Sequence, residues 1–165
     1  MLKALLLVAF ALYAAATGLA LAYLGSRDER LPRWMWSLLG LAAFFHLGSF
    51  CSLVREFWVW PENRWFFPVV TLHGVLSWMA FTNALVFLGV EGVGRLGILG
   101  AFVLPWTLLT GGAALLVDPK SVPLAEDLRS YWLNIHPMLL MLAYTGFANA
   151  FGVGLALLVG GGNGK

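Results

Sequence analysis

Five long apolar stretches follow one another along the chain, and short polar segments separate them. A helix needs about 20 apolar residues to cross the hydrocarbon core of a bilayer. By this measure the predicted spans are residues 2–24, 34–54, 67–90, 96–117 and 136–159. We therefore predict an all-α, polytopic transmembrane helical bundle that forms a single domain over residues 1–165.

The last polar connection is the longest and carries signals for the start of a helix. Ser121 can serve as a cap, Pro123 suits a first helical turn, and Glu126 with Asp127 favours a helix N-terminus. We predict from these signals a short helix on the membrane surface, running from Pro123 to about Leu133.

Composition supports a lipid environment. Of the 165 residues, 61% are hydrophobic and 11% are charged, whereas a soluble domain carries roughly 25% charged residues. The net charge of +2 comes from scattered residues and gives no reason to expect a nucleic-acid partner. The only cysteine, Cys51, excludes an internal disulfide and a C-x-x-C-H haem attachment site. The first apolar stretch is longer than a cleaved signal peptide requires, so we interpret it as a retained helix.

Five spans place the two termini on opposite sides of the membrane. Lys and Arg divide five against five between the two sides, so their totals do not decide the orientation. The densest group is Arg27, Arg30 and Arg33, which favours a cytoplasmic first connection. We expect a multi-pass protein of the plasma (inner) membrane with its N-terminus outside, and with Arg95 and Lys165 in the cytoplasm.

Small residues recur every four positions in the fifth stretch, at Gly146, Ala150 and Gly154. Such a stripe allows two helix backbones to approach closely. We favour packing within the chain as its role, and packing against another subunit is the alternative.

Three histidines are the candidate reactive groups. No Asp or Glu lies inside the predicted spans, and the chain lacks G-x-S-x-G, P-loop and H-E-x-x-H motifs. His46, His73 and His136 all fall towards the side of the second and fourth connections. Neutral imidazole is a good ligand for haem iron, and two histidines can hold a b-type haem without a covalent bond. The residues alone leave haem, quinone and no ligand open.

The histidines differ in their surroundings. We interpret His46, within Phe-Phe-His-Leu-Gly, as a residue that forms hydrogen bonds between helices, whereas His73 suits a structural bond and metal ligation equally. His136 precedes Pro137, which disfavours helical geometry at the preceding residue. We therefore expect His136 at a helix break near water, beside Trp132, and rank it first as a metal ligand.

Aromatic residues are concentrated in the second connection, where they indicate an interfacial belt or, alternatively, a platform for a flat ligand. They are Phe57, Trp58, Trp60, Trp65, Phe66 and Phe67. Arg129 lies on the same side and could pair with a haem propionate, although lipid phosphate is the more common partner of such a residue.

The stretch from Leu128 to Leu158 begins L-R-S-Y-W-L-N-I-H-P-M and continues through Y-T-G-F. It resembles a segment of the CcsA (ResC) family, the membrane haem-handling proteins of cytochrome c biogenesis, which reads S-x-W-L-x-x-H-V. Ser130, Trp132, Leu133 and His136 match this segment, while Pro137 stands in place of valine. The resemblance implies that His136 is an axial haem ligand at the outer face.

Upstream, His46 resembles a family histidine late in the second helix, and Pro68 resembles a proline that follows an arginine in an outer loop. The resemblance covers most of this chain but only the first half of a family member. The missing half holds the W-G-x-x-W-x-W-D haem segment, so the resemblance does not imply a complete enzyme.

We predict a membrane component of cytochrome c assembly that binds or passes non-covalent haem b at the outer face. It would act with another membrane subunit, and a periplasmic cytochrome c is a further expected partner. The alternatives are a b-haem or quinol-binding subunit of a respiratory electron-transfer complex, and a membrane anchor without a cofactor.

Overall fold

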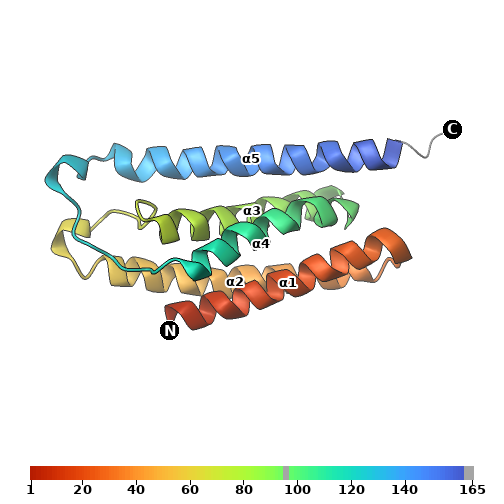
Figure 1. Cartoon of the computed structure of the whole chain (residues 1–165), viewed down its shortest axis with the longest axis horizontal. Helices are drawn as coiled ribbons and strands as arrows, with labels where there is room; N and C mark the ends of the chain where they lie inside the picture. The colour runs from red at the N-terminus through yellow and green to blue at the C-terminus, as the bar shows by residue number, and fades with distance from the viewer. Residues whose placement is uncertain (95–96, 162–165) are drawn as a thin grey trace.

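The structure is a computed structural model that describes residues 1–94 and 97–161. Within these residues it is a bundle of five long helices (Figure 1). The connections contain three short 3₁₀ turns within the described ranges, and no strand occurs there. The turns are η1 (Pro61–Asn63), η2 (Gly97–Leu99) and η3 (Glu126–Leu128). The predicted all-α class is therefore confirmed. The helices are α1 (Leu2–Ser26), α2 (Leu31–Phe57), α3 (Leu72–Gly94), α4 (Gly100–Leu116) and α5 (Trp132–Gly161).

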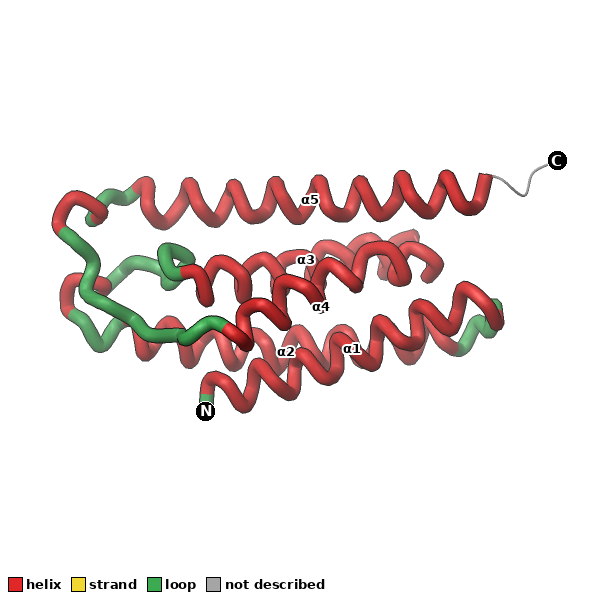
Figure 2. Tube along the Cα trace, viewed as in Figure 1, coloured by secondary structure: helices red, strands yellow, loops and turns green. Residues whose placement is uncertain are grey.

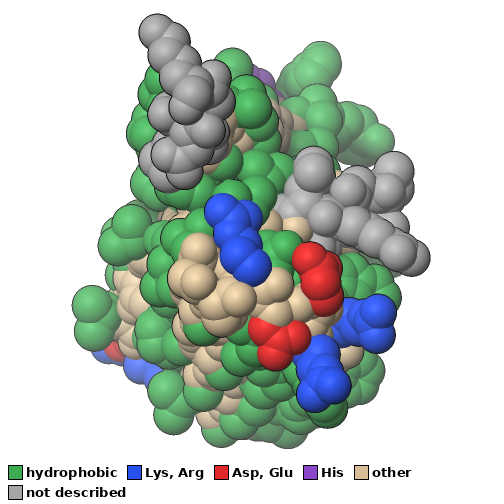
Figure 3. Space-filling model, turned by 90° about the vertical axis from the view of Figure 1, so that its right-hand side faces the viewer, with side chains coloured by type: hydrophobic (Ala, Val, Ile, Leu, Met, Phe, Trp, Pro, Cys, Tyr) green, Lys and Arg blue, Asp and Glu red, His purple; other side chains and the backbone are tan. Residues whose placement is uncertain are grey.

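Each of the five helices is long and apolar enough to cross a membrane. The α2–α3 and α4–α5 connections lie at the same end of the bundle as the start of α1, and α5 ends at the opposite end (Figure 2). We call the end of the bundle that carries the α2–α3 and α4–α5 connections the loop end. Charged side chains gather among hydrophobic ones at the other end, where the α1–α2 turn lies (Figure 3). Arg95 and Lys165, which we expect in the cytoplasm, lie outside the described residues, as does Leu96 at the start of the fourth predicted span.

Helix α3 begins at Leu72 rather than at residue 67, where the hydrophobic pattern placed its start. Residues before it form a turn in which the Thr71 backbone N–H donates to the Pro68 carbonyl. The Thr71 hydroxyl accepts a hydrogen bond from the Gly74 N–H at 3.1 Å, which is the bond of a helix N-cap. Apolar composition alone could not distinguish this capped turn from a first helical turn.

Helix α5 begins at Trp132, four residues before the predicted start, so His136 lies inside a helix and not at a break. The expectation of a break at Pro137 was wrong. Proline removes one backbone hydrogen bond, which here would have joined residue 137 to residue 133. Near a helix start this loss is limited, and membrane helices tolerate it.

The predicted surface helix from Pro123 to Leu133 was also wrong. Before α5 begins at Trp132, this segment forms only the 3₁₀ turn Glu126–Leu128, η3. Side chains, rather than the backbone groups of a helix, form hydrogen bonds with the backbone of this segment. The Leu124 N–H donates to Asn63 Oδ1 at 2.8 Å. The Arg129 guanidinium donates to the Leu124 carbonyl through Nε and Nη2, at 3.1 and 3.0 Å.

The core lies between α1, α2, α3 and α4. Small residues on α1, such as Ala9 and Ala16, are fully buried and allow α2 to pack closely through Leu39 and Ala42. Helix α5 covers α3 and α4 from one side. Only 22% of its most hydrophobic window is buried, against 50% for α3 and for α4. Most of α5 therefore faces lipid or another protein.

A polar network deep in the bundle attaches α5 to α3 and α4. Asn149 Nδ2 donates to Asn83 Oδ1 at 2.7 Å, and Asn83 Nδ2 donates to the Thr107 hydroxyl at 2.7 Å. A second link joins the hydroxyls of Thr82 and Thr145 at 3.0 Å. These bonds connect all three helices, so they determine which face of α5 is turned inward.

The small-residue stripe of α5 is turned outward. Gly146, Ala150 and Gly154 are exposed, and a Cβ atom added at either glycine would meet nothing within 4 Å. The inward face instead carries Gly152, where a Cβ would come within 2.8 Å of Val103. Our preference for packing of the stripe within the chain was therefore wrong, because the polar network orients α5 the other way.

Candidate functional site

His46 is fully buried, with 0% of its surface exposed, and it joins three helices. Its Nδ1 lies 3.1 Å from the Tyr13 hydroxyl of α1, and its Nε2 lies 2.9 Å from the Ser77 hydroxyl of α3. Both ring nitrogens are therefore engaged by side chains of the same chain. An axial bond from His46 to iron would require one of these hydrogen bonds to break.

His73 is 1% exposed and lies one helical turn from Ser77 on α3. Its Nδ1 lies 2.8 Å from the Ala114 carbonyl, near the end of α4. A carbonyl only accepts, so Nδ1 carries the proton and Nε2 is the nitrogen with a free lone pair. His73 thus ties α3 to α4, and only its Nε2 could bind a metal.

His136 differs from both because its side chain is exposed. It lines an open pocket of about 390 Å³ at the loop end, between the η3 segment and the first turns of α5. The walls are mainly apolar and include Leu128, Trp132, Leu133 and Pro137. The ring of His136 is therefore accessible beside an apolar surface, which suits one face of a porphyrin.

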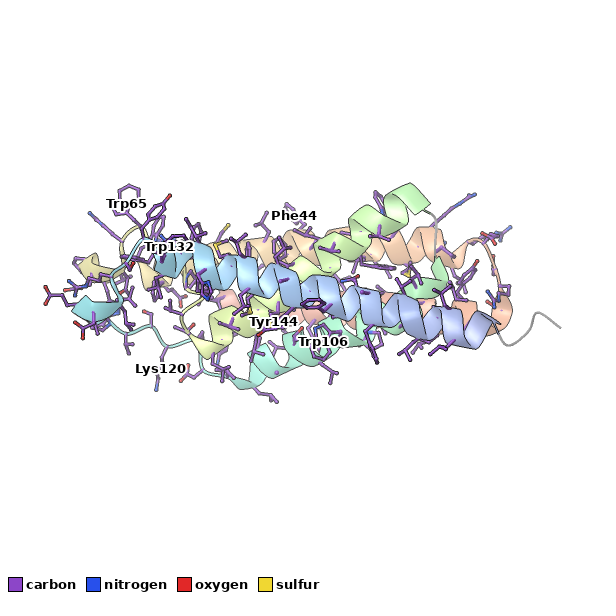
Figure 4. All side chains as sticks on the ribbon, turned by 90° about the horizontal axis from the view of Figure 1, so that it is seen from above. Phe44, Trp65, Trp106, Lys120, Trp132 and Tyr144 are labelled. Atoms are coloured by element: carbon purple, nitrogen blue, oxygen red, sulfur yellow. The ribbon has the colours of Figure 1, made fainter. Side chains whose placement is uncertain are left out.

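Large aromatic side chains surround this end of α5. Trp132 is 70% exposed and Trp65, from the α2–α3 connection, is 80% exposed. Both lie at the loop end, away from the bundle core (Figure 4). The backbone φ of Trp65 is 74°, a left-handed value that is costly for a bulky residue and needs support from its surroundings.

Asn134 provides that support. Its Nδ2 donates to the Trp65 carbonyl at 2.8 Å, and its Oδ1 accepts from the Phe67 N–H at 3.0 Å. The side chain therefore fastens the α2–α3 connection to the first turn of α5, two residues before His136. Sequence reasoning missed this residue. Its one signal was a polar amide between apolar neighbours, in Trp-Leu-Asn-Ile-His.

Arg129 is already engaged by the protein. Two of its nitrogens donate to the Leu124 carbonyl, and in the described part of the chain Nη1 has no partner and could meet a propionate. Its principal observed role is to hold the η3 segment that forms one wall of the pocket.

The structure does not gather the three histidines into one site. Within residues 1–94 and 97–161, no three His, Cys, Asp or Glu side chains lie close enough to hold a metal ion together. His46 and His73 lie within the bundle, and His136 lies at its surface. Of the three histidines, His136 is the one with an exposed side chain beside an apolar pocket.

Comparison with known proteins gives one consistent likeness. The chain is 35% identical over 91 residues to the cytochrome c biogenesis protein CcsA of Heterosigma akashiwo, and 36% identical over 90 residues to CcsA of Trieres chinensis. The match with CcsA of Prochlorococcus marinus extends over 127 residues, at 31% identity. These proteins are what the chain is similar to over part of its length.

The matches cover 53%, 50% and 69% of this chain but only 28%, 29% and 39% of those proteins. The chain thus spans less than two fifths of the length of the curated relatives it matches. No protein-family model matches the chain, and no solved structure matches it.

Proposed function

We propose that this chain, which resembles CcsA proteins over about half of its length, is a haem-handling membrane component of cytochrome c assembly. One observation carries the proposal. His136 is exposed beside an apolar pocket, whereas at least one ring nitrogen of each buried histidine is bonded to the chain itself. His136 is the histidine that a haem could reach without disturbing the bundle.

In this proposal His136 would bind the iron of haem b through a ring nitrogen, and the iron would supply the redox chemistry of the site. Trp132 and Leu133 would lie against the macrocycle and exclude water from it. Arg129 has one free nitrogen for a propionate, and Asn134 would hold the loop beside the ligand. His73 is the second candidate ligand through Nε2, and His46 the third.

The proposed site is incomplete, because His136 offers a single axial ligand at an open surface. We infer that another membrane subunit completes it and packs on the outward stripe of α5. A periplasmic cytochrome c is the proposed acceptor on the same face. The loop end would then lie outside an inner (plasma) membrane. On its own the chain would not be a complete enzyme.

The burial of His46 and His73 on neighbouring helices favours a second candidate. Two histidines inside a bundle suit a b-haem or quinol site of a respiratory subunit, provided that their present hydrogen bonds open. A membrane anchor without a cofactor is the third candidate. Haem binding excludes the anchor, and the histidine that ligates distinguishes the first two.

The test is the absorption spectrum of the purified chain with haem, compared between wild type and histidine variants. His136→Ala should lower bound haem or change its ligation while the protein yield stays the same, because this exposed side chain forms no core contact. His46→Ala should instead lower the yield, because it leaves Tyr13 and Ser77 without their buried partner.

An unaltered spectrum in His136→Ala, together with loss of haem in both His46→Ala and His73→Ala, would contradict the assembly proposal. That result would favour the respiratory subunit. If the wild-type chain binds no haem with or without its partner, the assembly proposal is contradicted, and a quinol-binding subunit or an anchor remains.

A further inference from the structure

A second hollow lies on the outside of the bundle, between α1 and α2. Its volume is about 290 Å³, and its lining is apolar apart from one sulfur atom, with Leu5, Phe44, Phe45, Leu47, Gly48 and Cys51 contributing. Gly48 contributes to this hollow because glycine has no side chain to fill the volume beside Leu5. Phe44 is 69% exposed and lies on the flank of the bundle (Figure 4). We call this hollow the α1–α2 groove.

The groove lies along one face of α2 that continues to Arg55. Phe44, Gly48 and Cys51 are spaced four and three residues apart, so they share a helical face, and Arg55 continues that face four residues later. From Phe44 to Arg55 the helix rises about 16 Å. Half of a hydrocarbon core is about 15 Å thick. The groove and Arg55 together thus match the depth of one lipid leaflet.

A cation lies where the groove meets the membrane surface. Arg55 is exposed in the last turn of α2, and in the described part of the chain its guanidinium has no hydrogen bond or ion pair. Glu56 is also exposed, but it points about 100° further around the helix. Lys3, at the same end, is about 200° around α1 from Leu5 and lies off the groove.

We propose that the α1–α2 groove binds one anionic phospholipid. An acyl chain would fill the apolar groove, and the lipid phosphate would accept hydrogen bonds from the Arg55 guanidinium. A hollow with no polar partner other than Cys51, open along a membrane-spanning flank, suits an acyl chain. The unpaired Arg55 guanidinium on the face of the groove favours a negatively charged headgroup. This site lies on α1 and α2 and does not depend on the proposed function.

Native mass spectrometry of the full chain with equal amounts of phosphatidylglycerol and phosphatidylcholine tests the proposal. Wild type should retain one phosphatidylglycerol in preference to phosphatidylcholine. Arg55→Gln should weaken phosphatidylglycerol retention about fivefold, the factor that corresponds to one interfacial cation. Lys3→Gln is the matched control and should retain lipid as wild type does.

Gly48→Leu tests the groove itself. The added Cβ meets Leu5 Cδ1 at an ordinary 3.6 Å, so the fold should persist, as circular dichroism would show, while the leucine side chain fills the groove. This variant should lose both lipids. The proposal is overturned if Gly48→Leu binds lipid like wild type, if Arg55→Gln keeps the preference, or if Lys3→Gln loses as much as Arg55→Gln. A dimer that forms without lipid and disappears in Gly48→Leu would assign the groove to a second copy instead.

Discussion

At the scale of single residues, Gly74 lies in close contact with the backbone turn that precedes α3. A Cβ atom at this position would overlap the Pro68 carbonyl oxygen of the preceding turn. That oxygen cannot simply move away, because it accepts the Thr71 backbone N–H and the Thr71 hydroxyl. The backbone turn that leads into α3 therefore requires glycine here.

Gly74→Ala should destabilise the protein by about 1–3 kcal/mol, because the overlap forces the turn and its cap apart. Gly89→Ala is the control within the same helix, where an added Cβ would meet nothing within 4 Å. It should be neutral or stabilise by about 0.5–1 kcal/mol, since alanine favours the helix. Thermal unfolding in one detergent measures both. Equal effects of the two substitutions would contradict the argument.

The residues of the candidate site fall into two groups, those that form hydrogen bonds within the chain and those that do not. His46, His73 and Arg129 are engaged in hydrogen bonds that hold elements together. In the described part of the chain, His136 has no hydrogen-bonding partner and is exposed. This difference is why the test of haem binding centres on His136.

At the scale of elements, the attachment of α5 rests on few polar contacts. Hydrogen bonds between membrane helices contribute about 0.6 kcal/mol on average and up to about 1.7 kcal/mol. The Asn83–Thr107 bond joins α3 to α4 and continues through Asn149 to α5. Thr110, one turn away on α4, donates only to the Trp106 and Thr107 carbonyls of its own helix.

This contrast gives a matched pair of substitutions. Thr107→Val should lower stability by about 1 kcal/mol, because it leaves an Asn83 amide hydrogen without its buried acceptor. Thr110→Val should change stability by less than about 0.5 kcal/mol, because its hydroxyl links no helices. Unfolding of both variants in the same detergent compares them. A larger loss for Thr110→Val would show that the network does not hold the helices together.

The outward stripe of α5 gives a prediction about the proposed partner. Ala150→Leu should reduce the amount of a second membrane subunit that purifies with the chain in mild detergent, since a larger side chain separates two close backbones. Phe151→Leu, exposed on α5 about 100° further around, should leave the association intact. A wild-type chain that stays monomeric and binds haem unaided would contradict the partnership.

At the scale of the whole molecule, the two ends of the bundle differ in chemistry. The loop end carries the exposed Trp65, Trp132 and His136, and the other end carries the arginines of the α1–α2 turn. The proposed haem chemistry requires the loop end outside. Although Lys and Arg divide equally between the two ends, the dense group Arg27, Arg30 and Arg33 favours a cytoplasmic α1–α2 turn. Both arguments give the same orientation.

A reporter that is active only in the cytoplasm, fused after Lys165, should therefore give a signal. The same reporter fused into the α4–α5 connection, near Lys120, should be silent. A well-expressed but silent C-terminal fusion, paired with an active fusion near Lys120, would reverse the orientation and remove the outer-face site.

The hydrophobic pattern by itself determined that the chain is all-helical, with five helices long and apolar enough to cross a membrane, because helices with internally bonded backbones suit long apolar runs in lipid. The polar segments between the apolar stretches gave the positions of the loops. The L-R-S-Y-W-L-N-I-H motif indicated His136 as the first candidate ligand. Tertiary structure alone decided which histidines form hydrogen bonds within the chain and which face of α5 packs against α3 and α4. Those outcomes depend on contacts between distant residues, such as Tyr13 with His46 and Asn83 with Asn149. Asn63 likewise accepts a hydrogen bond from the Leu124 N–H. This contact between distant residues stabilises an irregular segment where the local sequence predicted a helix.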